Sequence, residues 1–358
     1  MPFHVTVAVA PPEAAPPDLA TDLALVKAAL LYGDRVALVS PAASLLRRLL
    51  AEAAAARTPR QRLDLLASVA DDLGLGEAPA RLRGQMPEAA PLVERLWRAF
   101  CGRLDRAAGA SGLAQIAVAE RAGALEIVDL AAAEAPGTLA DAAADDYARR
   151  VLAAVGSGGT HPLLDAASGE GVRRALGRQR PLPDVRRHRA RHAALAADLS
   201  LRLPLFDRAT VAETLDVRAD LDRPLARFRG AVSRYAEAIA AEPWESGFGA
   251  EAEGVHTREV APAVADIEDA IRRTGYLREL VSRYADRPAL FAPLAAPALA
   301  LAVAGPDALA QAVSLALGAG AVGAGALRAW HEADDRRREA EAHRLSFYYA
   351  AGRRFAGG

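Results

Sequence analysis

The sequence contains very few cysteines and lysines. Cys101 is its only cysteine, which excludes an internal disulfide and a zinc site built from several cysteines. Of the 44 lysines and arginines, only Lys27 is a lysine. The formal net charge at pH 7 is −1, so the whole chain carries no charge excess that would attract nucleic acid or an anionic membrane. The opening residues lack the basic region and long apolar run of a signal peptide, which predicts a cytoplasmic protein.

The common catalytic and cofactor motifs are also missing. The chain has no G-x-S-x-G, no Walker A sequence and no H-E-x-x-H. A literal G-x-G-x-x-G begins at Gly318, but a charged stretch follows it where a dinucleotide site needs a second strand, so we interpret the match as accidental. The charges after His331 recur at i, i+4 spacing, which favours a solvated helix over a metal site. We therefore predict neither a cofactor nor a bound metal.

The first 40 residues have the pattern of a strand, a helix and a second strand. Val5, Val7 and Val9 alternate with other residues, which indicates a strand. A proline-rich loop and a helical pattern follow, and Gly33 suits the end of that helix. The run from residue 35 to 39 is a second apolar strand. This order predicts a βαβ unit with parallel strands and a right-handed crossover.

The rest of the chain is predicted to be mostly helical. Residues 43–109 and 139–155 have helical patterns, and residues 124–130 are typical of a third strand. Thr210 and Glu213 form a capping box that predicts a helix start, and Asp222 is expected to cap the next helix. The predicted fold is thus α+β and mostly α, with an incomplete Rossmann-like βαβ region, a helical region and a C-terminal hydrophobic helical hairpin. The predicted divisions are an α/β region over 1–159, a loop-like basic linker over 160–195, a helical domain over 196–287, and a hairpin with a charged C-terminal helix over 288–358.

The carboxyl ends of the first two strands are the first candidate site. Ligands of open parallel sheets bind beyond these ends, and here Asp18 and Ser40 follow the strands. The loop before Asp18 is rich in proline and has no glycine to present free backbone N–H groups, which argues against a phosphate. An acidic site of unmarked chemistry is therefore one alternative, and helix capping is the structural alternative.

An arginine-rich stretch from Arg173 to His192 is the second candidate site. Runs of this kind attract phosphate backbones, but this one has almost no aromatic residues on which bases could stack. A segment paired with acids elsewhere in the chain would explain it equally well. The nucleic-acid candidates are Arg186, Arg187, Arg189 and Arg191.

Two uncharged segments, 288–306 and 308–327, are the third feature of interest. Each is just long enough to span a bilayer. Prolines interrupt the first segment and few large apolar residues occur in the second, so a buried Ala-rich hairpin is the favoured interpretation and membrane insertion the alternative. If the hairpin is core, we expect its deletion to unfold the rest of the chain.

Two stretches resemble a known group of proteins. Residues 27–36 have the form K-x-x-L-L-Y-x-D-x-V, and the stretch LPLFDRATVAETLDVRADLDRPLARFRGAV covers residues 203–232. Both resemble segments of uncharacterised bacterial proteins, the second of them actinobacterial. The resemblance implies a shared architecture and no particular chemistry. It selects for testing Lys27, Tyr32, Asp34, Arg218 and Arg229.

These observations leave four hypotheses for function. The favoured one is a cytosolic, non-enzymatic interaction or accessory protein, for example in a conflict or defence system, that acts with a protein partner or as a homo-oligomer. The second is a membrane-acting effector that uses residues 288–327. The third is an enzyme with an acidic site at the βαβ strand ends, and the fourth is a nucleic-acid binder that uses the arginine-rich stretch.

Overall fold

A computed structural model describes residues 3–11, 19–70, 77–84, 88–130, 139–177, 182–267 and 342–356. Several of the residues discussed above lie outside these ranges. They are Asp18, the uncharged segments 288–306 and 308–327, the glycine motif from Gly318, and the charges from His331 to residue 341.

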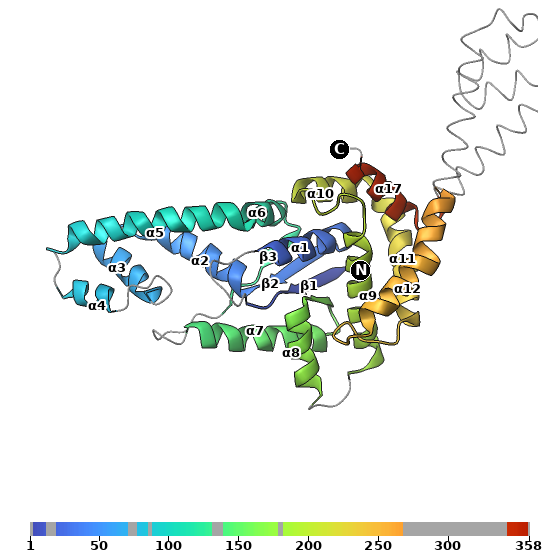
Figure 1. Cartoon of the computed structure of the whole chain (residues 1–358), viewed down its shortest axis with the longest axis horizontal. Coiled ribbons are helices and arrows are strands. Elements are labelled where there is room, and N and C mark those ends of the chain that lie inside the picture. The colour runs from blue at the N-terminus through green and yellow to red at the C-terminus, as the bar shows by residue number, and fades with distance from the viewer. Residues whose placement is uncertain are drawn as a thin grey trace, which may run out of the picture. The chain divides into compact units, whose positions relative to one another are not determined.

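The N-terminal half of the chain forms a parallel sheet of four strands in the order β3-β2-β1-β4 (Figure 1). β1 pairs with β2 and with β4, and β2 pairs with β3, in each case parallel. The predicted βαβ opening and the predicted third strand are therefore confirmed. The strands are β1 (His4–Ala8), β2 (Arg35–Val39), β3 (Leu125–Ile127) and β4 (His161–Leu164).

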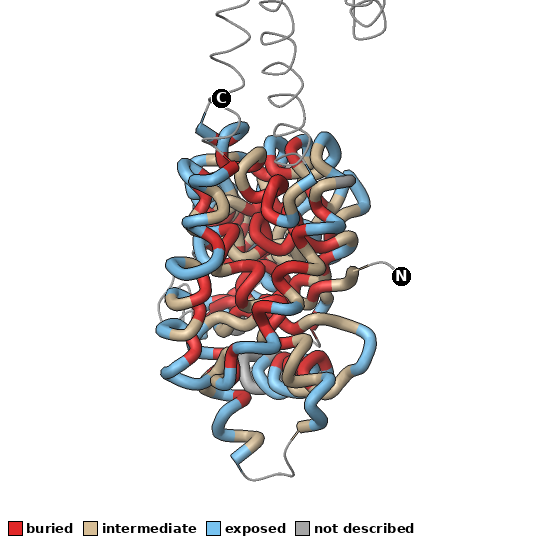
Figure 2. The backbone as a smooth tube through the Cα atoms, turned by 90° about the vertical axis from the view of Figure 1, so that its right-hand side faces the viewer, coloured by how far each residue is buried: buried red, intermediate tan, exposed pale blue. Residues whose placement is uncertain are grey.

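Helices cover both faces of the sheet (Figure 1). On one face α1 (Ala20–Tyr32) lies against β1 and β2. On the other, α7 (Leu139–Gly156) packs on Ala8 and Val39 through a core that includes Val151. Successive residues of a strand point to opposite faces, so the short strands bury side chains on both sides. The buried stretches of the backbone accordingly lie inside and the exposed ones at its outer turns (Figure 2).

A group of helices is inserted between β2 and β3 and extends to one side of the sheet (Figure 1). Its far end has a small core of its own around Leu63, Leu82 and Val93. We call α3 (Pro59–Ser68), α4 (Ala78–Arg83) and the first half of α5 (Ala90–Ser111) the helical lobe. The helices of the insertion are α2 (Pro41–Ala55), α3 (Pro59–Ser68), α4 (Ala78–Arg83), α5 (Ala90–Ser111) and α6 (Leu113–Arg121).

The prediction of a loop-like linker over residues 160–195 was wrong. The stretch contains β4, then α8 (Ala166–Leu176), and the first part of α9 (Asp184–Leu201). The N-cap of α8 is Asp165, whose side chain accepts a hydrogen bond from the backbone N–H of Ser168. The regular structure was missed because arginines dominate the first half of α9, whereas most of its buried alanines and leucines follow them. The α/β region consequently continues past residue 159.

The helices that follow include one confirmed start and one corrected start. Thr210 and Glu213 form the predicted capping box. The N-cap of the next helix is Leu221, not Asp222, and Asp222 is instead an acidic residue in its first turn. The elements are α10 (Val211–Asp220), α11 (Asp222–Ala238), α12 (Phe248–Val255), the π-helix η1 (His256–Val260) and α17 (Ser346–Ala356).

The chain divides into two compact units. The first unit comprises residues 1–222, 232–254 and 354–358, and the second comprises residues 223–231 and 255–353. In the second unit the ring of Phe228 stacks on that of Phe347 with 5.2 Å between centroids. Within the described ranges, no helix is both long enough and apolar enough to cross a membrane.

Candidate functional site

Lys27 lies inside the protein and donates hydrogen bonds to three backbone carbonyls. Its Nζ is 3.1 Å from the carbonyl oxygen of Phe206, 2.8 Å from that of Asp207 and 3.0 Å from that of Ala209. Burial lowers the pKa of the Lys27 ammonium, while nearby Asp207 and Glu213 act in the opposite direction. An ammonium has three N–H bonds, and these three carbonyls occupy all of them. Lys27 therefore fastens the turn before α10 to α1.

Asp34 connects the same two parts of the chain. One carboxylate oxygen of Asp34 lies 3.3 Å from the Arg218 guanidinium, and the other accepts a 2.5 Å hydrogen bond from the backbone N–H of Phe3. With Lys27, these contacts join residues 27–36 to residues 206–218. These contacts give Lys27, Asp34 and Arg218 a structural role. Arg229 belongs to the other compact unit.

Tyr32 is part of an aromatic cluster that contains three histidines. Its hydroxyl is hydrogen-bonded to Nε2 of His192, and both side chains are buried. The Phe3 ring stacks on His161 with 3.8 Å between centroids, and His192 has its centroid 5.5 Å from His161 and 5.9 Å from His188. Burial lowers the pKa of His188. The imidazole rings act here as packing groups between α1, β4 and α9.

Ser40 is the N-cap of α2 at the carboxyl end of β2. Its side chain accepts a hydrogen bond from the backbone N–H of Ala43 and is almost fully buried. β1 has β2 on one side and β4 on the other, so the order of the strands reverses its direction between β1 and β4. Such a switch point is where open parallel sheets bind ligands.

Side chains that follow β4 and lie on α7 and α8 bind one another at this switch point. Asp165 accepts hydrogen bonds from the backbone N–H groups of Ala10 at 3.2 Å and of Ser168 at 2.9 Å. The Ser168 hydroxyl contacts Asp165, the Tyr147 hydroxyl and, at 3.3 Å, the carbonyl oxygen of Ala8. Burial raises the pKa of the Tyr147 phenol. These bonds fasten α7 and α8 to the end of β1, and they engage the same groups that a ligand would need.

The four arginines predicted to contact nucleic acid lie on α9. Arg187 pairs with Asp184 and, at 3.4 Å, with Glu242. Arg191 donates a 2.9 Å hydrogen bond to the carbonyl oxygen of Ile239, and its side chain is only 14% exposed. Arg186 and Arg189 are half-buried. Two of the four cations are therefore engaged within the fold rather than directed at a ligand.

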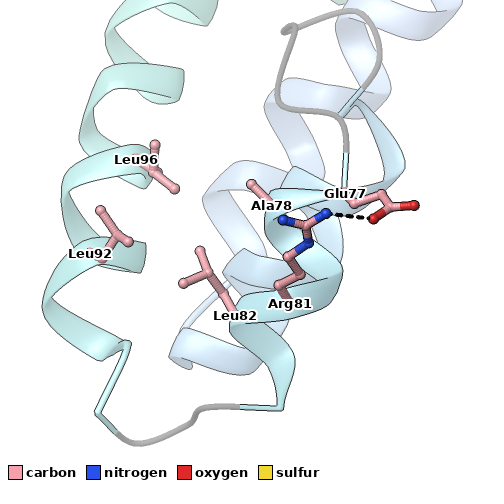
Figure 3. A pocket seen from close by; sticks show the side chains of 6 residues that line it. All are labelled: Glu77, Ala78, Arg81, Leu82, Leu92 and Leu96. Atoms are coloured by element: carbon pink, nitrogen blue, oxygen red, sulfur yellow. Dashed lines mark hydrogen bonds and ion pairs between the residues drawn. The ribbon is translucent and has the colours of Figure 1, made fainter.

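A groove between α4 and α5 has a volume of about 540 Å³ (Figure 3). Leu92 and Leu96 of α5 face Leu82 of α4 across it. Leu92 is 39% exposed. The polar edge is formed by Arg81, which pairs at 2.9 Å with Glu77 on the same helix. The lining is Glu77, Ala78, Arg81, Leu82, Leu92 and Leu96.

A smaller hollow of about 290 Å³ lies at the amino-terminal ends of the strands. Thr6 and Thr160 line it, and their hydroxyls are hydrogen-bonded to each other at 2.8 Å. Arg35 and Glu126 also line it. Parallel sheets bind ligands at the opposite, carboxyl ends of their strands. Among the described residues, no group of three or more His, Cys, Asp or Glu side chains is placed to hold a metal ion.

The groove was not predicted from the sequence, although one signal of it was present. On α5 the buried stripe consists of Val93, Trp97, Phe100 and Leu104. Leu92 and Leu96 lie beside this stripe at i, i+4 spacing, and they form a second apolar edge on which Leu96 packs against the lobe core and Leu92 stays exposed. The partner surface on α4 could not be read from the sequence, because the position of α4 depends on tertiary packing.

No protein-family model, no curated protein and no solved structure matches this chain.

Proposed function

We propose that this chain is a non-enzymatic protein-interaction protein that binds an apolar helical segment of a protein partner in the groove between α4 and α5. The observation that carries the proposal is the pair of leucines, Leu92 and Leu96, that faces Leu82 across an open groove of about 540 Å³. A groove with apolar walls is the usual receptor for the apolar face of an amphipathic helix.

The composition of the groove supports a helical ligand over a small polar one. Four of its six lining residues are apolar, and the two charged ones, Glu77 and Arg81, pair with each other at the edge. Apolar side chains of a partner would remove Leu92 from water, and burial of apolar surface contributes roughly 25 cal/mol per Å². Catalysis would need free polar groups inside the groove.

The polar residues of the first unit support the same proposal. Lys27, Asp34, Ser40 and Arg218 each bind the protein's own backbone or side chains. A catalytic nucleophile or general base must reach a substrate proton or carbon, and these groups are instead directed inward. Their placement favours a rigid body that presents the helical lobe.

A peptide-display selection on the immobilised full-length protein tests the proposal. We expect amphipathic peptides with apolar residues at i and i+3 or i+4 to be enriched. Leu92→Glu should weaken the binding of the enriched peptides at least about tenfold, because it places a charge where an apolar contact is needed. Fluorescence anisotropy with labelled peptides measures the change.

The matched control for Leu92→Glu is Leu45→Glu. Leu45 lies on α2, does not line the groove, and is also 39% exposed. Both substitutions add one negative charge at an equally exposed leucine, so a general effect of charge would appear in both variants. Failure to enrich any peptide, or equal binding by the two variants, would contradict the proposed function.

A further inference from the structure

The exposed surface of α5 continues from the groove as a row of arginines. At about 100° per residue, Arg95, Arg103 and Arg106 lie within about 60° of Leu92 around the helix axis. All three are exposed. From Leu96, Arg103 is seven residues further on and Arg106 ten. Leu92 and Leu96 therefore lie at the N-terminal end of a helix face that also contains Arg95, and Arg103 and Arg106 lie further along the same face.

The acids of α5 do not lie on this face. Glu94 and Asp105, its two acidic residues, are about 200° and 220° around the axis from Leu92. Glu94 is also engaged, since it forms an ion pair with Arg62 of α3. Consequently the face that contains Leu92 has positive charges and no negative charge from its own helix. Near-zero net charge of the whole chain conceals this local excess.

We infer that the partner segment is an acidic amphipathic helix, whose apolar residues enter the groove while its carboxylates lie along Arg95, Arg103 and Arg106. This inference rests on the proposed function and specifies the chemistry of the ligand at the same groove. Charge complementarity of this kind adds modest affinity and sets specificity and orientation. The leucine end favours a protein over a nucleic acid, because a phosphate backbone offers nothing that would cover Leu92.

The inference fixes which end of the ligand lies over which end of α5. The apolar end of the ligand must lie over the first two turns of α5, next to α4, because Leu82 provides the opposite wall only there. The acidic end must lie over the third and later turns, where Arg103 and Arg106 are found. A ligand with the reverse order of apolar and acidic residues along its axis would have to run in the opposite direction along α5.

The experiment uses a peptide from the selection above, or a synthetic four-turn amphipathic helix with leucines and glutamates, and the full-length protein. In a first arm, every glutamate of the peptide is replaced by glutamine. In a second arm, the protein carries Arg103→Glu and Arg106→Glu together. We expect each change to weaken binding roughly tenfold at low salt, and by less as salt is raised. Fluorescence anisotropy measures the dissociation constants.

Arg98→Glu is the matched control for the arginine variants. Arg98 is exposed on the same helix but lies about 240° around the axis from Leu92, on the side of the two acids. It should leave binding of the acidic peptide unchanged. Equal loss with Arg98→Glu would indicate a general effect of charge and would overturn the assignment of the arginine row.

The outcomes separate this inference from the proposed function. If apolar peptides bind in a manner sensitive to Leu92→Glu but are indifferent to their glutamates and to the arginine variants, the groove binds helices and the acidic partner is wrong. If no peptide binds, both fail. If a single-stranded oligonucleotide displaces the peptide and binds more tightly, in a manner sensitive to Arg103→Glu and Arg106→Glu, the row is a nucleic-acid surface and the inference is overturned.

Discussion

Lys27 is the residue whose chemistry the structure explains most fully. Its side chain is only 4% exposed, and its three N–H bonds meet three backbone carbonyls of one turn. The ring of Phe206 lies under the ammonium at 5.5 Å. A compact ammonium with tetrahedral donors fits three converging carbonyls, whereas a planar guanidinium is larger and spreads its donors in a fork. This fit accounts for a lysine in a chain that otherwise uses arginine.

The turn that Lys27 holds contains a residue in an uncommon conformation. Leu205 has a φ of 57°, in the left-handed region that residues other than glycine rarely adopt. Such a conformation costs of order 1–3 kcal/mol and persists only where surrounding contacts impose it. The carbonyls of the next residues, Phe206 and Asp207, are the ones that Lys27 binds. The ammonium therefore offsets the strain of this turn.

Substitution of Lys27 should destabilise the protein whether or not the charge is kept. We expect both Lys27→Met and Lys27→Arg to lower the free energy of unfolding by about 2–4 kcal/mol, because buried carbonyls lose charge-assisted hydrogen bonds. Urea denaturation measures the effect. Arg208→Lys, at an exposed position of the same turn, is the control and should change little. Wild-type stability in Lys27→Arg would show that the shape of the ammonium is unimportant.

At the scale of elements, the junction between α1 and β2 depends on a glycine because of close packing. Gly33 has a φ of −88°, which any residue can adopt. A Cβ atom at this position would lie 2.8 Å from the carbonyl oxygen of Ala29 and 2.9 Å from Cγ2 of Val5. Both contacts are closer than real Cβ atoms allow. The glycine is thus required because α1 and β1 approach each other closely where the chain turns into β2.

Two glycine-to-alanine substitutions should have opposite effects. Gly33→Ala is expected to lower the free energy of unfolding by about 1–3 kcal/mol, because the added methyl group overpacks a rigid contact. Gly102→Ala on α5 is expected to raise it by about 0.5–1 kcal/mol, because nothing lies within 4 Å of the new Cβ and alanine favours the helix. Thermal and urea unfolding of both variants measure the signs. A stabilised Gly33→Ala would contradict the close contact.

At the scale of the molecule, two hydrophobic cores in the described part of the first unit are separate from each other. One joins the sheet to α7 and α8 and includes Val39, Val151 and Val172. The other is the small core of the helical lobe, formed by Leu63, Leu82, Ala89 and Val93. A small core supplies less burial than the sheet core, so the lobe should open without unfolding of the sheet. The groove proposed for binding lies on this less stable part.

One substitution in the core of the helical lobe and one in the sheet core should show whether the two cores unfold separately. We expect Val93→Ala to destabilise the helical lobe by about 2 kcal/mol and to speed amide hydrogen exchange in α3, α4 and the start of α5. Exchange in β1 and β2 should remain as in the wild type. Val151→Ala, in the sheet core, is the counterpart and should speed exchange in the sheet and α7. Uniform faster exchange in Val93→Ala would mean that the lobe and the sheet unfold together.

The sequence by itself determined the features that depend on neighbours in the chain. The βαβ opening follows from the alternation of Val5 and Val7 and from the helical spacing after it, and the start of α10 follows from Thr210 and Glu213. These patterns are local, because a strand or a cap is specified within a few residues. The sequence also singled out Lys27 and Asp34 as positions to test, without indicating what they contact.

Only the tertiary structure decided which distant groups meet. Lys27 and the carbonyl of Phe206 are 179 positions apart, and no local pattern encodes such a pair. β4 was missed because it is only four residues long and contains Pro162, a residue that sheets accept mainly at edge strands, which β4 is. The groove also could not be predicted from local patterns, since it requires α4 to face Leu92 and Leu96 of α5. Long-range partners are chosen by packing of the whole chain, and sequence periodicity reports only which face of each element is available for that packing.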